Sequence, residues 1–269
     1  STDKTVTQNI NTLCTACGSW MTYDIAEGKW SVVINQAGTF SYTYARTAHT
    51  VTTTGVSYDS SIKKIGSSSM YFDGSSNAKI ATSTDFGFGT SSWTIECWVY
   101  RGSASRTEGI IDLRTTQTQL APYIQVVNAA PKLLLNGTNV ITGGNVLTAN
   151  AWHHIAVVKN GTSTKMYVNG TQTGSSYTDN NTYVSTAPVS IGEAYTGAIT
   201  PYNFLGRIDE VRISAGVARY TGTFTPSTTA FENDNFTTLL LHVNGDASDD
   251  VGPGTFTGTN TLWNVASRG

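Results

Sequence analysis

Bond-cleaving chemistry in this chain would have to come from its acidic residues. Hydrolysis of a glycosidic bond uses two carboxylates that flank the bond, and residues of one strand share a face only at alternate positions. Glu96 is followed by Trp98 at the alternate position. Asp209 and Glu210 are adjacent and are expected on opposite faces, and Glu193 has no acidic neighbour. The sequence therefore predicts that the protein is not an enzyme, with a glycoside hydrolase as the less favoured alternative.

Histidine and cysteine chemistry is also not predicted. His153 and His154 are adjacent in a predicted strand, so only one of them is expected to face the interior, as a hydrogen-bonded core residue. Cys14 and Cys17 form a C-x-x-C pair without a second pair of zinc ligands, and Cys97 is expected to be a small core residue. The G-x-S-x-G, H-E-x-x-H and P-loop patterns do not occur.

One structural calcium ion is the cofactor that the acidic residues could bind, because calcium prefers carboxylate and carbonyl oxygens in loops. The candidate ligands are Asp73 beside a turn and Asp209 at the start of a strand, with residues 249–250 as a further acidic site in the tail. The alternatives are that Asp73 accepts hydrogen bonds from turn amides and that Asp209 pairs with Arg207 or Arg212.

Two polar loops, at residues 175–186 and 193–204, are rich in tyrosine and asparagine. Exposed aromatic rings and planar amides are the groups that bind sugars, and the two loops are expected at one edge of the fold. The alternatives are plain solvated loops or contacts with another subunit. The candidate ligand-binding residues are Tyr177, Asn180, Tyr183, Tyr195, Tyr202 and Asn203.

The composition limits the class of protein. Apolar residues make up 39% of the 269 residues and charged residues only 13%, with a net charge of −2 and no basic cluster. This excludes nucleic acid as an expected partner, and no apolar run is long enough for a membrane helix. Residues 1–10 are polar and lack the pattern of a signal peptide. A polar surface with little charge suits an extracellular or virion β protein.

Alternating apolar and polar residues dominate the middle of the chain. The clearest run is residues 93–99, and similar runs follow with turn signals between them at 152–158, 165–169, 189–192 and 204–213. Such short strands predict an all-β, antiparallel two-sheet sandwich. Asn-Gly pairs at 136–137, 160–161 and 169–170 predict two-residue hairpin turns.

The ends of the chain differ from the middle. Apolar residues at helical spacing over 6–17, and strands at 20–25 and 29–35, predict a small helix-plus-hairpin segment that docks on something larger. The expected organisation is a docking segment at 1–36, a jelly-roll domain at 37–230, and a C-terminal strand and tail at 231–269. The strand at 239–245 is expected either to close the sheet or to begin another repeat.

Five short motifs in order resemble the laminin-G-like jelly rolls of the concanavalin A-like lectin and glucanase superfamily. Residues 239–245 also resemble the family's first strand, although they follow the domain. Residues 218–226 resemble the ending of phage members, and residues 13–30 are similar to a piece of tailed-phage tail-tip proteins. The five motifs are K-I-G with S-M-Y-F-D-G at 64–74, the run 86–99, W-H-H-I-A-V-V at 152–158, M-Y-V-N-G at 166–170 and G-R-I-D-E-V-R-I at 206–213.

The resemblance implies a lectin-like fold, and the E-x-D-x-x-E strand that the family's glucanases carry is absent. The leading hypothesis is a non-catalytic appendage on the outer surface of a virion that binds a host-surface glycan or receptor. The alternative is a structural virion protein that decorates or cements a tail or capsid. Both hypotheses place the chain in an oligomeric assembly with other virion subunits, without nucleic acid and without membrane insertion.

Overall fold

The computed structural model divides the chain into two compact units, residues 47–252 and residues 1–46 together with 253–269. These limits differ from the expected 1–36, 37–230 and 231–269, because β3 (Gly38–Tyr44) pairs with β20 (Gly254–Asn260), and β19 (Thr237–Leu241) pairs with a strand of the larger unit. The structure describes residues 48–103, 105–184, 187–194 and 202–252, and the strand backbones at 19–24, 29–34, 38–44 and 254–260.

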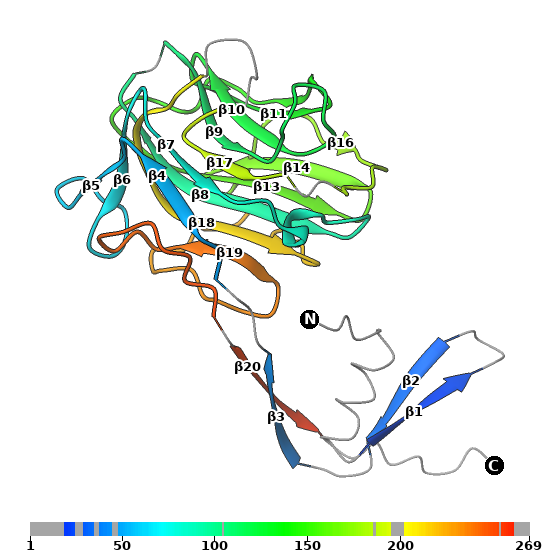
Figure 1. Cartoon of the computed structure of the whole chain (residues 1–269). Helices are drawn as coiled ribbons and strands as arrows, with labels where there is room; N and C mark the ends of the chain where they lie inside the picture. The colour runs from blue at the N-terminus through cyan, green and yellow to red at the C-terminus, as the bar shows by residue number, and fades with distance from the viewer. Residues whose placement is uncertain are drawn as a thin grey trace. The chain divides into compact units, whose positions relative to one another are not determined.

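The larger unit is a sandwich of two antiparallel sheets, as predicted (Figure 1). In spatial order, the seven-stranded sheet consists of β12 (Thr138–Thr142), β11 (Ala130–Leu135), β10 (Tyr123–Val127), β9 (Thr107–Asp112), β17 (Val189–Ile191), β7 (Asn77–Ile80) and β4 (Val51–Thr54). The nine-stranded sheet consists of β15 (Thr171–Gln172), β14 (Ser163–Val168), β13 (Trp152–Asn160), β8 (Trp93–Arg101), β18 (Leu205–Ala215), β6 (Ser69–Asp73) and β5 (Ser57–Asp59), with β16 (Tyr177–Thr178) on β14 and β19 on β18.

The core lies between the two sheets and follows from strand alternation. On β8, Trp93, Ile95, Cys97 and Val99 point inward and are at most 1% exposed. Cys97 is thus the small core residue that was predicted. Apolar residues of the facing sheet, such as Ile111, belong to the same cluster. Burial of these side chains is the main driving force for folding of the sandwich.

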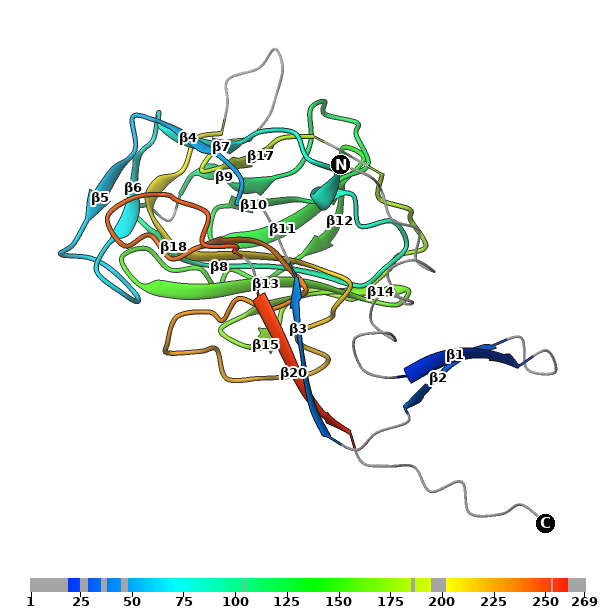
Figure 2. The same ribbon diagram turned by 60° about the horizontal axis from the view of Figure 1, so that its bottom comes forward.

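Part of the outer face of the nine-stranded sheet is covered by the chain that follows β18, residues 218–231, which we call the cover. Figure 2 shows this segment as the orange trace beneath β13. Tyr220 and Phe224 pack against an apolar cluster on β13 and β14, and Phe231 packs against Trp98 on β8. This cover buries both faces of the central strands. His153, opposite the inward Val99, is the one histidine that faces the core, as predicted, whereas His154 faces outward and is buried by the cover, which was not predicted.

Two of the three predicted Asn-Gly turns are confirmed. Asn136 and Asn169 each have positive φ and are followed by a glycine with positive φ, which is the pattern of a two-residue hairpin turn. Asn160 instead remains in its strand, opposite Ser163, and only Gly161 has positive φ there. The turn is thus one residue later than predicted.

The smaller unit contains two separate two-stranded ladders. β1 (Ser19–Asp24) pairs with β2 (Lys29–Ile34), which confirms the predicted hairpin, and β3 pairs with β20. The expected helix over 6–17, with Cys14 and Cys17, lies outside the described residues.

Where the larger unit begins and ends, the His49 amide and ring both bond the carboxylate of Asp249 at 2.8 Å. Within the described parts, no helix has the length and apolar character to span a bilayer.

The turn at Gly170 provides a test of the cover's packing. A Cβ at Gly170, where φ is +81°, would lie 1.7 Å from the carbonyl oxygen of Phe224, whereas a Cβ at Gly161, where φ is +57°, would meet nothing within 4 Å. We expect Gly161→Ala to cost about 1–2 kcal/mol, from left-handed backbone strain alone, and Gly170→Ala to cost about 2 kcal/mol more, because it also displaces the cover. Urea unfolding of both variants measures the difference, and equal losses would show that the Phe224 contact does not hold the cover.

Candidate functional site

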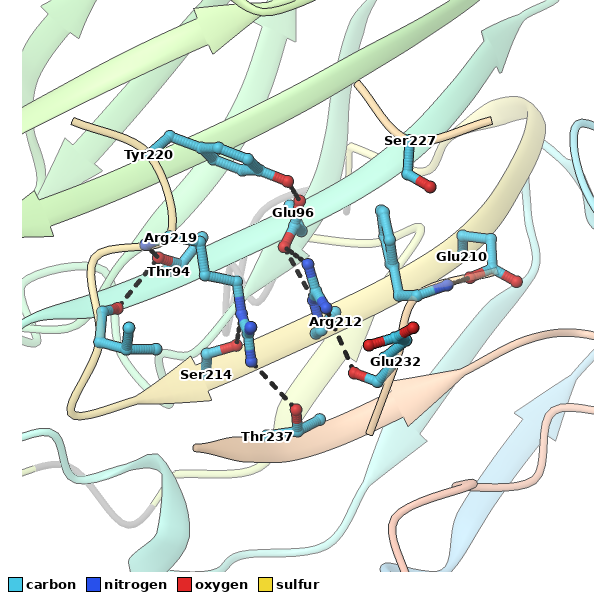
Figure 3. A network of polar contacts seen from close by, with 12 residues as sticks. Thr94, Glu96, Glu210, Arg212, Ser214, Arg219, Tyr220, Ser227, Glu232 and Thr237 are labelled. Atoms are coloured by element: carbon cyan, nitrogen blue, oxygen red, sulfur yellow. Dashed lines mark hydrogen bonds and ion pairs between the residues drawn. The ribbon is translucent and has the colours of Figure 1, made fainter. Parts of the chain in front are cut away.

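The carboxylate of Glu96 is fully buried beneath the cover and is saturated with partners (Figure 3). Arg212 donates from Nε and Nη2 to Oε1 at 2.9 and 2.7 Å. Tyr220 donates to Oε2 at 2.7 Å, and the His154 ring lies 3.1 Å from the same oxygen. Burial alone would raise the pKa of Glu96, but the hydrogen bond from His154 and the charge of Arg212 bring that pKa below its usual value. Glu96 is thus an ionised structural anchor.

The adjacent carboxylates of Asp209 and Glu210 are both fully buried as well. Glu210 has a φ of +50°, and the pairing of β18 with β8 shifts register between Asp209 and Arg212, which marks a β-bulge. Glu210 accepts from the amide of Phe231 and bonds the ring of His242. The bulge buries both carboxylates in place of the predicted opposite faces, and neither is available to a substrate.

The calcium candidates Asp73 and Asp209 do not come together as a ligand set. Asp73 is exposed, and its Oδ1 accepts from Ser75 and Ser76 in the turn. The Oδ2 atom of Asp209 accepts from the amides of residues 64–65 at 2.8 and 3.1 Å, and the expected pairing with Arg207 or Arg212 does not form. Across the described stretches, no group of three or more metal-ligating side chains occurs. These residues do not fit the six to eight oxygen ligands of calcium.

Two of the predicted ligand-binding residues are core or near-core residues. Tyr183 is 1% exposed, contacts Phe88 and Trp93 edge to face, and donates to the buried carboxylate of Asp179 at 2.7 Å. Asn203 is 7% exposed and donates to a backbone carbonyl. Their placement in an exposed binding surface was wrong, because the Tyr183 hydroxyl is held by the buried Asp179 and the Asn203 amide by the carbonyl of Ser76.

The other predicted ligand-binding residues are divided between the two sheets. Tyr177 is half-buried on β16 beside β14, near the exposed Asn180. Tyr202 is 41% exposed, and its carbonyl accepts from the amide of Gly109 on β9. Tyr195 lies outside the described residues. The single platform expected from the two loops is therefore not formed, and only Tyr202 lies beside a polar sheet face.

That face is the outer surface of the seven-stranded sheet. Residues directly opposite each other in antiparallel strands point to the same side. The pairs Lys79–Ser190, Ser190–Asp112, Asp112–Tyr123 and Tyr123–Leu134 form a continuous row across β7, β17, β9, β10 and β11. The row places a carboxylate and a phenol at its centre.

Arg114 and Glu193 complete what we call the β9–β10 site, defined as Asp112, Arg114, Tyr123, Glu193 and Tyr202. Arg114 bonds both oxygens of Asp112 at 2.8 Å, and its guanidinium lies 4.2 Å from the centre of the Tyr123 ring. Burial raises the pKa of Tyr123 well above its usual value, so its hydroxyl stays protonated. The Tyr123 hydroxyl and Glu193 Oε2 are buried without a hydrogen-bond partner.

Sequence reasoning missed most of this site. Asp112 ends β9 and Arg114 follows two residues later, and this spacing was a usable signal for a same-face pair. Tyr123 comes to lie opposite Asp112 only through the register of β9 with β10, which shifts at a bulge. No pattern in the sequence specifies that register, so Tyr123 and Glu193 could not be selected.

Asp209 leads to a test of pH dependence. Burial raises its pKa to about 6, above the ordinary 3.8, with a further contribution from the charge of Glu210, and amide hydrogen bonds only partly offset this. The folded state thus binds more protons between pH 4 and 6, and stability falls as pH rises through that range, by at most roughly 3 kcal/mol. Asp209→Asn keeps an oxygen that accepts the hydrogen bonds from the backbone amides, but its side chain does not titrate. Urea unfolding should therefore show that the free energy of unfolding of the variant rises relative to that of the wild type from pH 4 to 7. A difference that does not vary with pH would contradict this account.

Comparison with known proteins identifies the family. A family model described as the concanavalin A-like lectin/glucanases superfamily matches residues 72–219. Among solved structures, a candidate carbohydrate binding protein from Bacteroides ovatus has a TM-score of 0.51 at 12% identity, covering 84% of this chain and 93% of that one. No curated protein matches the chain.

Two further structures are less similar. Domain 4 of an extracellular arabinanase from Geobacillus stearothermophilus has a TM-score of 0.45 at 16% identity, over 74% of this chain and 94% of that one. The enzymatically active domain of tailspike protein 2 from bacteriophage CBA120 has a TM-score of 0.49 at 12% identity, over 64% of this chain and 29% of that one. The family match spans more than half of the sequence and agrees with the two-sheet fold, so this chain belongs to the concanavalin A-like lectin/glucanases superfamily.

Proposed function

We propose that this protein is a non-catalytic module that binds a glycan on a host surface, and that it is displayed on the outside of a virion. The observation that carries the proposal is the β9–β10 site, where the half-exposed Tyr202 lies near the buried Tyr123 hydroxyl, which has no hydrogen-bond partner among the described residues, and where Glu193 Oε2 is paired only with the ammonium of Lys79. The virion setting is supported by the phage-like run at 218–226 and by the low content of charged residues.

The chemistry of the site suits a sugar. A pyranose ring has an apolar C–H face, which packs on an aromatic ring, and a rim of hydroxyls, which donate and accept hydrogen bonds. Tyr202 offers the ring, and the Tyr123 hydroxyl and Glu193 carboxylate offer hydrogen-bonding atoms. The Arg114–Asp112 pair is held rigidly, so little side-chain order is lost on binding.

Absence of catalysis is supported by the state of the carboxylates. Glu96, Asp209 and Glu210 are fully buried and bonded within the fold. At the β9–β10 site, Asp112 is held by both nitrogens of Arg114, which leaves Glu193 without the second free carboxylate that glycoside hydrolysis needs. Release of reducing sugar from any bound glycan, abolished by Glu193→Gln, would overturn this part of the proposal.

A structural role in the virion is the second candidate, and one surface favours it. On the outer face of the nine-stranded sheet, Tyr71, Arg207, Tyr100 and Trp152 form a row across four neighbouring strands, and all are partly exposed. Arg207 lies 4.8 Å from the Tyr71 ring and 5.5 Å from the Tyr100 ring. Tyrosine, tryptophan and arginine are the residues that dominate protein interfaces. If this role holds, Arg207→Ala will weaken assembly with other subunits and leave glycan binding unchanged.

The stacking role of Tyr202 can be tested with a matched control. Tyr202 and Phe236 are 41% and 38% exposed, but Phe236 lies before β19, on the other sheet. We expect Tyr202→Ala to weaken glycan binding by about 1–2 kcal/mol, or roughly 5- to 30-fold, through loss of ring contact. Phe236→Ala should leave binding unchanged. Glycan-array binding followed by calorimetry measures both, and equal effects of the two variants would contradict a role for Tyr202.

A further inference from the structure

We propose that the β9–β10 site selects an uncharged sugar, and that the Tyr123 hydroxyl and the Glu193 carboxylate bind two of its hydroxyl groups. This inference rests on the proposed function and adds to it the class of ligand and the groups that determine specificity. The inference starts from two buried polar atoms, the Tyr123 hydroxyl and Glu193 Oε2, that make no hydrogen bond within the described residues.

Unpartnered buried polar atoms are uncommon in folded proteins, because each one loses its hydrogen bonds to water and gains none in return. Tyr123 is 2% exposed and lies directly opposite Asp112 in the pairing of β10 with β9, so both side chains are on the outer face. Glu193 Oε2 lies on the same face, 3.4 Å from the ammonium of Lys79, without a hydrogen bond. The other six such atoms in the described residues belong to the nine-stranded sheet, so these two, on one face with the exposed Tyr202, are the pair that we assign to a ligand.

The two atoms require different things from that ligand. The carboxylate oxygens of Glu193 accept hydrogen bonds, whereas the phenol of Tyr123 can both donate and accept. A hydroxyl group satisfies either atom, and neighbouring hydroxyls of one sugar ring or of two linked rings can satisfy both. The ligand is therefore expected to present hydroxyls at both positions.

The charges around the two atoms argue against an acidic sugar. Both cations at the site are already paired, Arg114 with Asp112 and Lys79 with Glu193. A ligand carboxylate or sulfate would approach two protein carboxylates, and like charges brought together in this way weaken binding strongly. The next ammonium group along this sheet belongs to Lys132 on β11, which lies opposite Gln125 of β10. β9 separates both of these residues from Glu193, so Lys132 is not part of the site.

The first experiment uses Tyr123→Phe in the full chain, with Tyr167→Phe as the matched control. The Tyr167 hydroxyl is also buried and unpartnered, but it lies on β14 in the other sheet. The probes are immobilised lactose, maltotriose, cellotriose and chitotriose. For the probe that the wild type binds, Tyr123→Phe should weaken binding at least tenfold and leave the midpoint of thermal unfolding unchanged or raised, because the hydroxyl has no hydrogen-bond partner among the described residues.

Tyr167→Phe should show the same unfolding behaviour with unchanged binding. Unchanged binding by Tyr123→Phe would overturn the inference and assign the hydroxyl to an ordered water only. A lowered unfolding midpoint would overturn it too, by showing that the hydroxyl has a structural role.

The second experiment tests charge. Sialylated and sulfated counterparts of the bound probe should bind at least tenfold more weakly than the neutral sugar, and Glu193→Gln should narrow that difference because it removes one repelling charge. Tighter binding of the acidic sugars, lost in Lys132→Ala, would overturn the inference while leaving glycan binding intact. Failure of the wild type to bind any neutral or acidic glycan would instead overturn the proposed function itself.

Discussion

The buried carboxylate of Glu96 is the interaction on which the nine-stranded sheet and its cover depend. Its oxygens bond Arg212 from the neighbouring strand and Tyr220 from the cover (Figure 3). They also bond His154 from the strand on the other side, so one carboxylate joins four parts of the chain. A carboxylate at such a depth is tolerated only when it is paired and fully hydrogen-bonded. The partners must therefore stay together, and this fixes the cover against the sheet.

The cover makes the outer faces of the two sheets different. With Tyr220, Phe224 and Phe231 packed on it, much of the nine-stranded sheet has become a second interior. The seven-stranded sheet keeps an outer face with Lys79 and Tyr202 still open to solvent. The Tyr123 hydroxyl lies on this second sheet, near the exposed Tyr202, and has no hydrogen-bond partner among the described residues; this is the physical basis for assigning binding to the β9–β10 site.

Much of the fold was predictable because strand alternation and turn residues are local signals. The run 93–99 and the Asn-Gly pairs at 136–137 and 169–170 specify strands and turns from neighbouring residues alone. The site was less predictable, because its members meet through strand register and bulges. Tyr183 shows the difference: its type and its polar loop suggested an exposed ring, while the buried Asp179 four residues earlier holds it inside. Likewise, the burial of His154 on the outer face depends on a cover some 65 residues later in the chain.

The pairing of β3 with β20 means that the sandwich is inserted into the other unit rather than joined to its end. Because His49 contacts Asp249, the chain enters and leaves the sandwich at neighbouring points. An insertion with adjacent ends can be exchanged during evolution for another domain, or shortened to a simple loop, without separating the strands that flank it. The same connectivity gives the sandwich two covalent tethers, so a single proteolytic cut in either one would not release it.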